Sequence, residues 1–124
     1  MSEKRALQVA VAIAGLVPVT AGGAGVFDPR LLNFLDAPQT LSHAAYLSGL
    51  LLGIGIGFWS LIPSIEKQGR VFALLTAIVA LGGLARLGIA VRFHVWTLPV
   101  ILPLAMELVV TPALWFWQRR VSRL

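Results

Sequence analysis

Four apolar runs, each long enough to cross a lipid bilayer, fill most of this chain of 124 residues. A helix needs roughly 20 consecutive apolar residues to span the hydrocarbon core. The mean hydropathy is +0.88, and a water-soluble globule of this size has too little interior to hide so much apolar surface. We therefore expect an all-α membrane protein, a bundle of four transmembrane helices. The predicted spans cover residues 6–27, 41–62, 71–93 and 98–117.

The segments between the runs are short, so we expect a single transmembrane domain over residues 1–124. The longest connection, residues 28–42, mixes polar and apolar residues and begins with Asp28-Pro29, a pair that favours the start of a helix. We predict a short helix lying in the membrane interface here. The first run ends in small residues that resemble a signal-peptide cleavage region, but we expect it to be retained as a membrane helix.

Basic residues are unevenly divided between the two sides of the predicted bundle. Seven lie on one side, against only Arg30 and Arg92 on the other, and short loops rich in Lys and Arg stay in the cytoplasm. Trp residues lie near both boundaries, where amphipathic rings are favoured. We therefore expect a multi-pass protein of the bacterial inner membrane with both termini in the cytoplasm. The seven basic residues are Lys4, Arg5, Lys67, Arg70, Arg119, Arg120 and Arg123.

The composition argues against several classes of function. The chain has no Cys, which excludes disulfides, thiolate metal sites and Cys nucleophiles. Its net charge of +5 comes from the ends of the apolar runs and not from one patch, so we expect no nucleic-acid partner. No Ser–His–Asp set, phosphate-binding loop or catalytic carboxylate pair can be drawn. We expect a non-enzymatic protein without a bound cofactor or metal.

Arg86 and Glu107 lie inside the third and fourth apolar runs. A charge inside a span costs about 2.5–3.5 kcal/mol on insertion scales, so such residues are usually paired or face water. At about 1.5 Å per residue, Arg86 lies about 24 Å and Glu107 about 18 Å from the cytoplasmic end, a gap that an Arg side chain can bridge. Antiparallel neighbouring helices would bring them together. We predict an intramembrane ion pair. Either the pair fixes the packing register of the two helices, or Glu107 is a proton-coupled or ligand-binding carboxylate.

Small residues recur at helical spacing in the second and third runs. Such residues let another backbone approach closely in a membrane. We predict a helix-packing surface, whose partner helix is either in this chain or in a second copy. Its residues are Ala45, Gly49, Gly53, Gly57, Gly82 and Gly83.

His43 and His94, the two histidines, fall near the outer ends of their predicted helices, and Tyr46 lies one turn beyond His43. Two imidazoles at one surface suit a metal or haem, but no short ligand spacing links them and no third ligand is evident. Interfacial hydrogen bonding is the favoured interpretation. These three residues form a candidate polar site at the outer face.

Five short segments stand out along the chain: residues 47–55 (LSGLLLGIG), 62–63 (IP), 82–86 (GGLAR), 107–109 (ELV) and 117–121 (WQRRV). Together they resemble a bacterial family of small four-helix membrane proteins known only as a domain of unknown function, DUF4345. The resemblance implies the fold and an inner-membrane location, and it supplies no activity. It places Arg86 and Glu107 in family motifs without giving them a role.

Three hypotheses for the function follow from these features. The first is a non-enzymatic accessory or structural subunit, either a self-associating bundle or a component of a larger membrane complex. The second is a small dimeric transporter in which Glu107 is the proton-coupled carboxylate. The third is a protein that binds a lipid, quinone or other lipophilic ligand between its helices. We favour the first hypothesis, because the sequence contains the predicted helix-packing surface and no recognisable set of catalytic residues.

Overall fold

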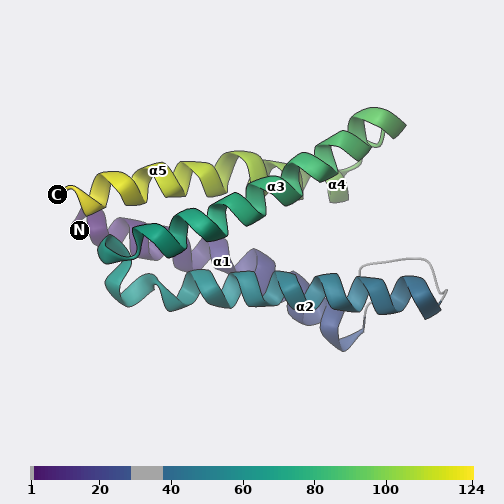
Figure 1. Cartoon of the computed structure of the whole chain (residues 1–124), viewed down its shortest axis with the longest axis horizontal. Coiled ribbons are helices and arrows are strands. Elements are labelled where there is room, and N and C mark those ends of the chain that lie inside the picture. Colours follow the sequence, from purple (N-terminus) through teal and green to yellow (C-terminus); the bar gives the residue numbers. More distant parts are fainter. Residues whose placement is uncertain (1, 29–37) are drawn as a thin grey trace. The chain divides into compact units, whose positions relative to one another are not determined.

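The computed structural model describes residues 2–28 and 38–124, and within these ranges the chain forms helices and turns without a strand (Figure 1). The first three long helices are α1 (Glu3–Phe27), α2 (Pro38–Ser60) and α3 (Gly69–Phe93). The fourth is built from α4 (Leu98–Ala105), the π-helical segment η3 (Met106–Val110) and α5 (Thr111–Ser122), which follow one another without a break. All four are long and apolar enough to cross a membrane. The predicted all-α fold with four spanning helices is confirmed.

The helix ends differ from the predicted spans by a few residues. The fourth helix continues to Ser122, past the predicted end at residue 117, and basic side chains in a last turn favour this because they complement the helix dipole. Between α2 and α3 the chain makes a short 3₁₀ segment, η2 (Ile62–Lys67). The predicted interfacial helix falls mainly on residues 29–37, outside the described residues.

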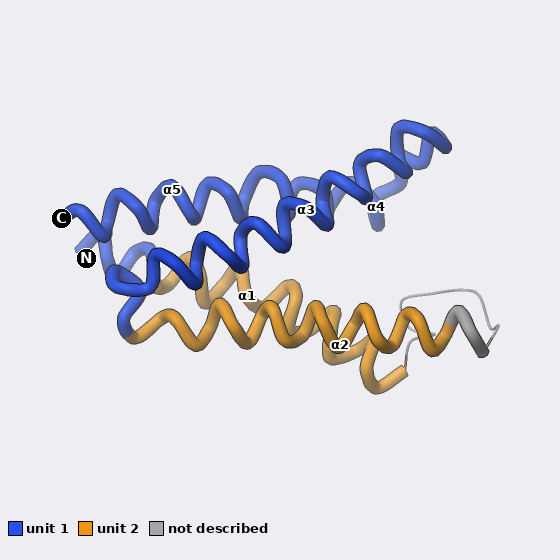
Figure 2. Tube along the Cα trace, viewed as in Figure 1, with its two compact units in different colours: residues 1–7, 64–124 blue, residues 8–63 orange. Residues whose placement is uncertain are grey.

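The chain divides into two compact units, unit 1 with residues 1–7 and 64–124 and unit 2 with residues 8–63 (Figure 2). Unit 2 is a hairpin of α1 and α2. The indole Nε1–H of Trp59 in α2 donates to the carbonyl of Ala12 in α1, at 3.1 Å, and the Gln8 amide donates to the Ile62 carbonyl, at 2.7 Å. These two bonds join the N-terminal half of α1 to the C-terminal end of α2 and the residues that follow it. The prediction of one domain over the whole chain stays a prediction.

Close approach of backbones holds the middle of the unit 2 hairpin. A Cβ added to Gly22 in α1 would lie 2.5 Å from the amide nitrogen of Leu52 and 2.7 Å from the carbonyl oxygen of Ser48, both in α2. A Cβ on Gly55 would lie 2.7 Å from the Val19 side chain. Only a residue without a side chain permits these contacts, as at other membrane helix crossings. By contrast, a Cβ on Gly23 would meet no atom within 4 Å.

This contrast between adjacent glycines gives a matched test of the hairpin. Gly22→Ala should lower the free energy of unfolding by about 1–3 kcal/mol, because its methyl group meets backbone atoms that cannot move aside. Gly23→Ala should be neutral or stabilising by up to about 1 kcal/mol, through helix propensity alone. Unfolding in mixed micelles titrated with SDS measures both. Equal effects of the two variants would contradict the α1–α2 contact.

Unit 1 packs α3 against α4, η3 and α5, so the third and fourth spans are antiparallel neighbours, as the short connection predicts. Leu7, Ile65 and Phe72 of this unit are fully buried. Ion pairs bring the N-terminal residues to one end of the unit: Lys4 Nζ lies 3.1 Å from Glu66 Oε2, and Arg120 Nε lies 2.9 Å from Glu3 Oε1. Both terminal segments of the chain therefore lie at the same end of unit 1 (Figure 1).

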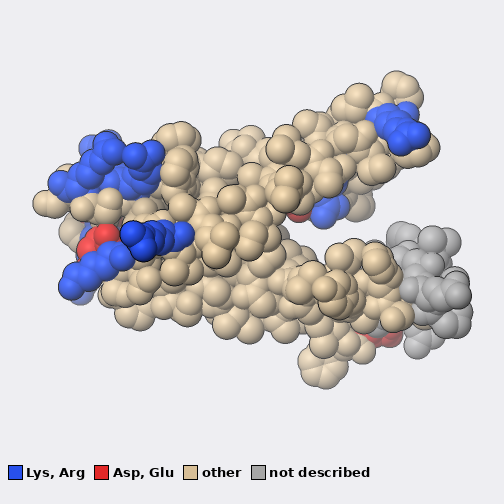
Figure 3. All heavy atoms as spheres, viewed as in Figure 1, with Lys and Arg blue, Asp and Glu red and all other residues tan. Residues whose placement is uncertain are grey.

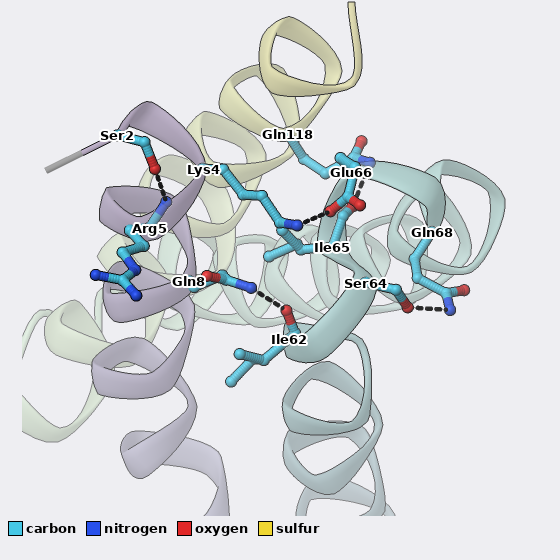
Figure 4. Close-up of polar contacts among 10 residues, drawn as sticks. All are labelled: Ser2, Lys4, Arg5, Gln8, Ile62, Ser64, Ile65, Glu66, Gln68 and Gln118. Atoms are coloured by element: carbon cyan, nitrogen blue, oxygen red, sulfur yellow. Dashed lines mark hydrogen bonds and ion pairs between the residues drawn. The ribbon is translucent and has the colours of Figure 1, made fainter. Parts of the chain in front are cut away.

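Polar side chains complete this end of unit 1, as Figure 4 shows. The amide of Gln118, fully buried, donates to the carbonyl of Ile65 at 2.9 Å and so joins α5 to η2. Glu66, next in η2, accepts a hydrogen bond from its own backbone N–H and one from Lys4, and these lower the pKa of its carboxyl from the usual 4.5. The charged form of Glu66 is thus favoured by folding.

The lowered pKa of Glu66 predicts an acid-sensitive contact. A carboxylate whose pKa is depressed in the folded chain contributes stability above its unfolded pKa, and that stability is lost as the pH falls through the folded pKa. Lowering the pH below 4.5 should therefore weaken the η2 contact with Lys4. Glu66→Gln should be less stable than the wild type at pH 7 and lose less stability on acidification. Thermal unfolding in micelles at several pH values measures this, and identical acid profiles would contradict it.

Candidate intramembrane site

Arg86 and Glu107 meet inside unit 1. The Arg86 Nη2 atom donates to Glu107 Oε1 at 3.2 Å, and Nε donates to Glu107 Oε2 at 3.3 Å. This two-pronged geometry adds directional specificity as well as energy to a pair of a guanidinium and a carboxylate. Arg86 lies within the candidate span of α3 and Glu107 within that of the fourth helix. The structure thus brings together the two residues for which the sequence predicts an intramembrane ion pair.

Glu107 is presented by a widened helical turn. It belongs to η3, in which the backbone N–H of Thr111 bonds to the carbonyl of Met106, five residues earlier. The Thr111 hydroxyl donates to the same carbonyl at 2.7 Å. Pro103 and Pro112, on either side, cannot donate backbone hydrogen bonds, and π turns of this kind occur frequently at functional sites. A shift of hydrogen-bond register therefore sets the direction of the carboxylate.

Gly83 lets the two helices approach at the ion pair. A Cβ at this position would lie 2.8 Å from the Cβ of Glu107 and 2.9 Å from the Leu108 side chain. Its neighbour Gly82 faces open space, with no atom within 4 Å of an added Cβ. Gly83 therefore supports the contact between α3 and η3, and Gly82 lies outside it.

The two partners differ in burial. The Glu107 side chain is 18% exposed, whereas the Arg86 side chain keeps 42% of its surface exposed. Glu107 is thus mostly buried, whereas part of the Arg86 side chain is accessible from outside the pair. Leu84 and Ile89, close to Arg86 in α3, are exposed apolar side chains, as expected for a surface that meets lipid or another protein.

The remaining predicted packing residues are less enclosed than Gly83. In α2, a Cβ on Gly49 would meet only Val26, at 3.9 Å, and one on Gly53 would meet nothing within 4 Å. Ala45 and Gly57 are half-buried in the same helix. The close contacts of α2 involve instead Gly55 and the backbone opposite Gly22. The role of the predicted helix-packing surface stays a prediction.

The predicted polar site at the outer face involves residues of both units. His43 and Tyr46 are exposed on α2 in unit 2. His94, in unit 1, ends α3 in the left-handed conformation at φ 53°, and the backbone N–H groups of His94 and Val95 both bond to the Ala90 carbonyl. The structure thus gives His94 a helix-capping role. The prediction that the three residues share one polar site stays a prediction.

Comparison with known proteins identifies the family. A family model described as a domain of unknown function, DUF4345, matches residues 6–118. The chain belongs to this family. The match covers both Arg86 and Glu107, and the description of DUF4345 assigns no activity to either. No curated protein and no solved structure matches the chain.

A double-mutant cycle measures the strength of the pair. Glu107→Gln leaves the cation of Arg86 uncompensated and should destabilise unit 1 by about 2.5–3.5 kcal/mol in a bilayer. Combining it with Arg86→Met should restore part of that loss, with a coupling energy of about 1–3 kcal/mol. Unfolding titrations of the wild type, both single variants and the double variant give the cycle. Additive losses would contradict an energetic link between the two side chains.

Proposed function

We propose that this membrane protein is a non-enzymatic accessory subunit that docks within the bilayer on a larger membrane complex through the Arg86 face of α3. The observation that carries the proposal is the exposed part of Arg86: 42% of its side chain remains open, within a candidate membrane span. A guanidinium exposed to hydrocarbon is costly, and intramembrane charges usually face protein or a water-filled cavity. A polar surface of a partner protein would cover it.

The surroundings of Arg86 suit such a partner. Gly82 lies four residues before Arg86 and therefore on the same helical face, and no atom lies within 4 Å of its missing Cβ. A small residue beside a polar one is the usual pattern of helix contacts in membranes, because it combines close backbone approach with hydrogen bonding. Glu107 fixes the guanidinium through Nε and Nη2, which leaves Nη1 as a donor for the partner.

The topology completes the proposal. Both terminal segments lie at one end of unit 1, where Glu3 pairs with Arg120. The excess of basic residues in the short loops at that end supports a cytoplasmic position for both termini in the inner membrane of a bacterium. A subunit of this kind would contribute helices and no catalytic groups to the complex.

Two glycines of α3 provide a matched test. Gly82→Leu fills the Arg86 face, whereas Gly88→Leu adds the same side chain about 200° around the helix from Arg86, and both positions are open in the structure. After gentle extraction, native mass spectrometry should detect a stoichiometric partner with the wild type and Gly88→Leu. With Gly82→Leu the partner should be reduced about tenfold or more, because overpacking costs about 1–3 kcal/mol. A bare monomer in all samples would contradict the proposal.

One observation favours a second function, a small dimeric proton-coupled transporter. Glu107, whose side chain is 18% exposed, lies on a π turn between two prolines, an arrangement that suits a carboxylate whose helix changes conformation. Such a transporter would move protons in proteoliposomes on addition of substrate, and Glu107→Gln would abolish the movement. That outcome, together with a bare dimer in the native mass spectra, would replace the subunit proposal.

A further inference from the structure

The C-terminal turns of α5 carry a basic hollow of about 400 Å³ within unit 1. Its lining residues are Phe116, Arg119, Arg120, Arg123 and Leu124. Figure 3 shows that Lys and Arg side chains gather at the end of unit 1 where Figure 1 marks the C-terminus. The structure contains three cations here and an apolar wall beside them.

The charge in the hollow is only partly balanced. Arg120 is paired with Glu3. Arg119 lies over the Trp115 ring at 5.2 Å, a cation–π contact that orients the guanidinium and leaves its in-plane donors free. The backbone N–H of Arg123 donates to the Arg120 carbonyl at 3.1 Å, but the Arg123 side chain makes no hydrogen bond or ion pair with the described residues. Among the described residues, two positive charges therefore remain without an acidic side-chain partner, on Arg119 in the last turn of α5 and on Arg123, the residue that follows the helix.

The hollow is graded from apolar to cationic along α5. Phe116 lies three residues before Arg119, and Arg123 follows Phe116 by about 10 Å along the helix, at about 1.5 Å per residue. Trp115 and Trp117 flank Phe116 in the sequence, and such rings favour the level of the headgroups. An apolar side chain at the edge of the hydrocarbon core, followed by arginines one and two turns further out, matches the order of an acyl chain and its phosphate.

We propose that this hollow binds an anionic phospholipid, with the phosphate between Arg119 and Arg123 and the first part of an acyl chain against Phe116. The two uncompensated arginines select a headgroup with net negative charge over a zwitterionic one, because a headgroup that carries its own ammonium repels them. Arginine binds phosphate oxygens in a two-pronged geometry. A lipid with two phosphates engages both arginines and binds more tightly than one with a single phosphate.

Native mass spectrometry of the delipidated protein tests this site. The protein in detergent is titrated with phosphatidylglycerol, cardiolipin and phosphatidylcholine of matched acyl chains. Each basic residue near an anionic membrane surface contributes about fivefold in affinity. Arg123→Gln should therefore weaken phosphatidylglycerol binding about fivefold, and the double variant Arg119→Gln/Arg123→Gln about 25-fold. Phosphatidylcholine binding should be weak and unchanged in both.

Arg92→Gln is the matched control, because it removes the same charge from an exposed position of α3 outside the hollow. It should bind phosphatidylglycerol as the wild type does, and circular dichroism verifies the helix content of every variant. Equal affinity for phosphatidylglycerol and phosphatidylcholine would overturn the proposal, as would an equal loss in Arg92→Gln. Displacement of the lipid by millimolar inorganic phosphate would also overturn it, because the hollow would then be a plain anion site.

Discussion

The cost of charge in hydrocarbon is the constraint on which unit 1 depends. Arg86 and Glu107 lie within candidate spans, and neither is tolerable there alone. Their mutual contact requires α3 and η3 to lie close, which Gly83 permits, and it requires the turn at Glu107 to point its carboxylate toward α3. The ion pair therefore depends on both Gly83, which has no side chain, and the widened turn at Glu107.

The two units are stabilised by different means. In unit 2, backbone approach at Gly22 and two hydrogen bonds to carbonyls join α1 to α2. In unit 1, ion pairs occur both within the spans and at the end where the termini lie. Charges at that end also leave arginines available for lipid phosphate, so one set of basic residues can serve topology, packing and lipid contact.

The sequence predicts the spans because each apolar run is long enough to cross the bilayer. It predicts the ion pair because an isolated charge within such a run costs much free energy unless it is paired. It does not predict which glycines touch a neighbour. Gly22 and Gly23 differ by only one position, and the surrounding helix is apolar all round, so the hydrophobic pattern does not define its rotation. The sequence does not predict the π turn either. The nine-residue spacing of Pro103 and Pro112 around Glu107 indicates disturbed hydrogen bonding, but the new register depends on tertiary contacts.

The central claim is that a direct ion pair between Arg86 and Glu107 joins α3 to the fourth span in the membrane. Solid-state NMR of the protein in lipid bilayers measures it directly, through the dipolar coupling between ¹⁵N in the Arg86 guanidinium and ¹³C in the Glu107 carboxyl. The structure predicts a measurable coupling, because the nearest guanidinium nitrogen lies 3.2 Å from a carboxylate oxygen and the carboxyl carbon is bonded to that oxygen. Absence of this coupling, with both signals resolved, would contradict the claim.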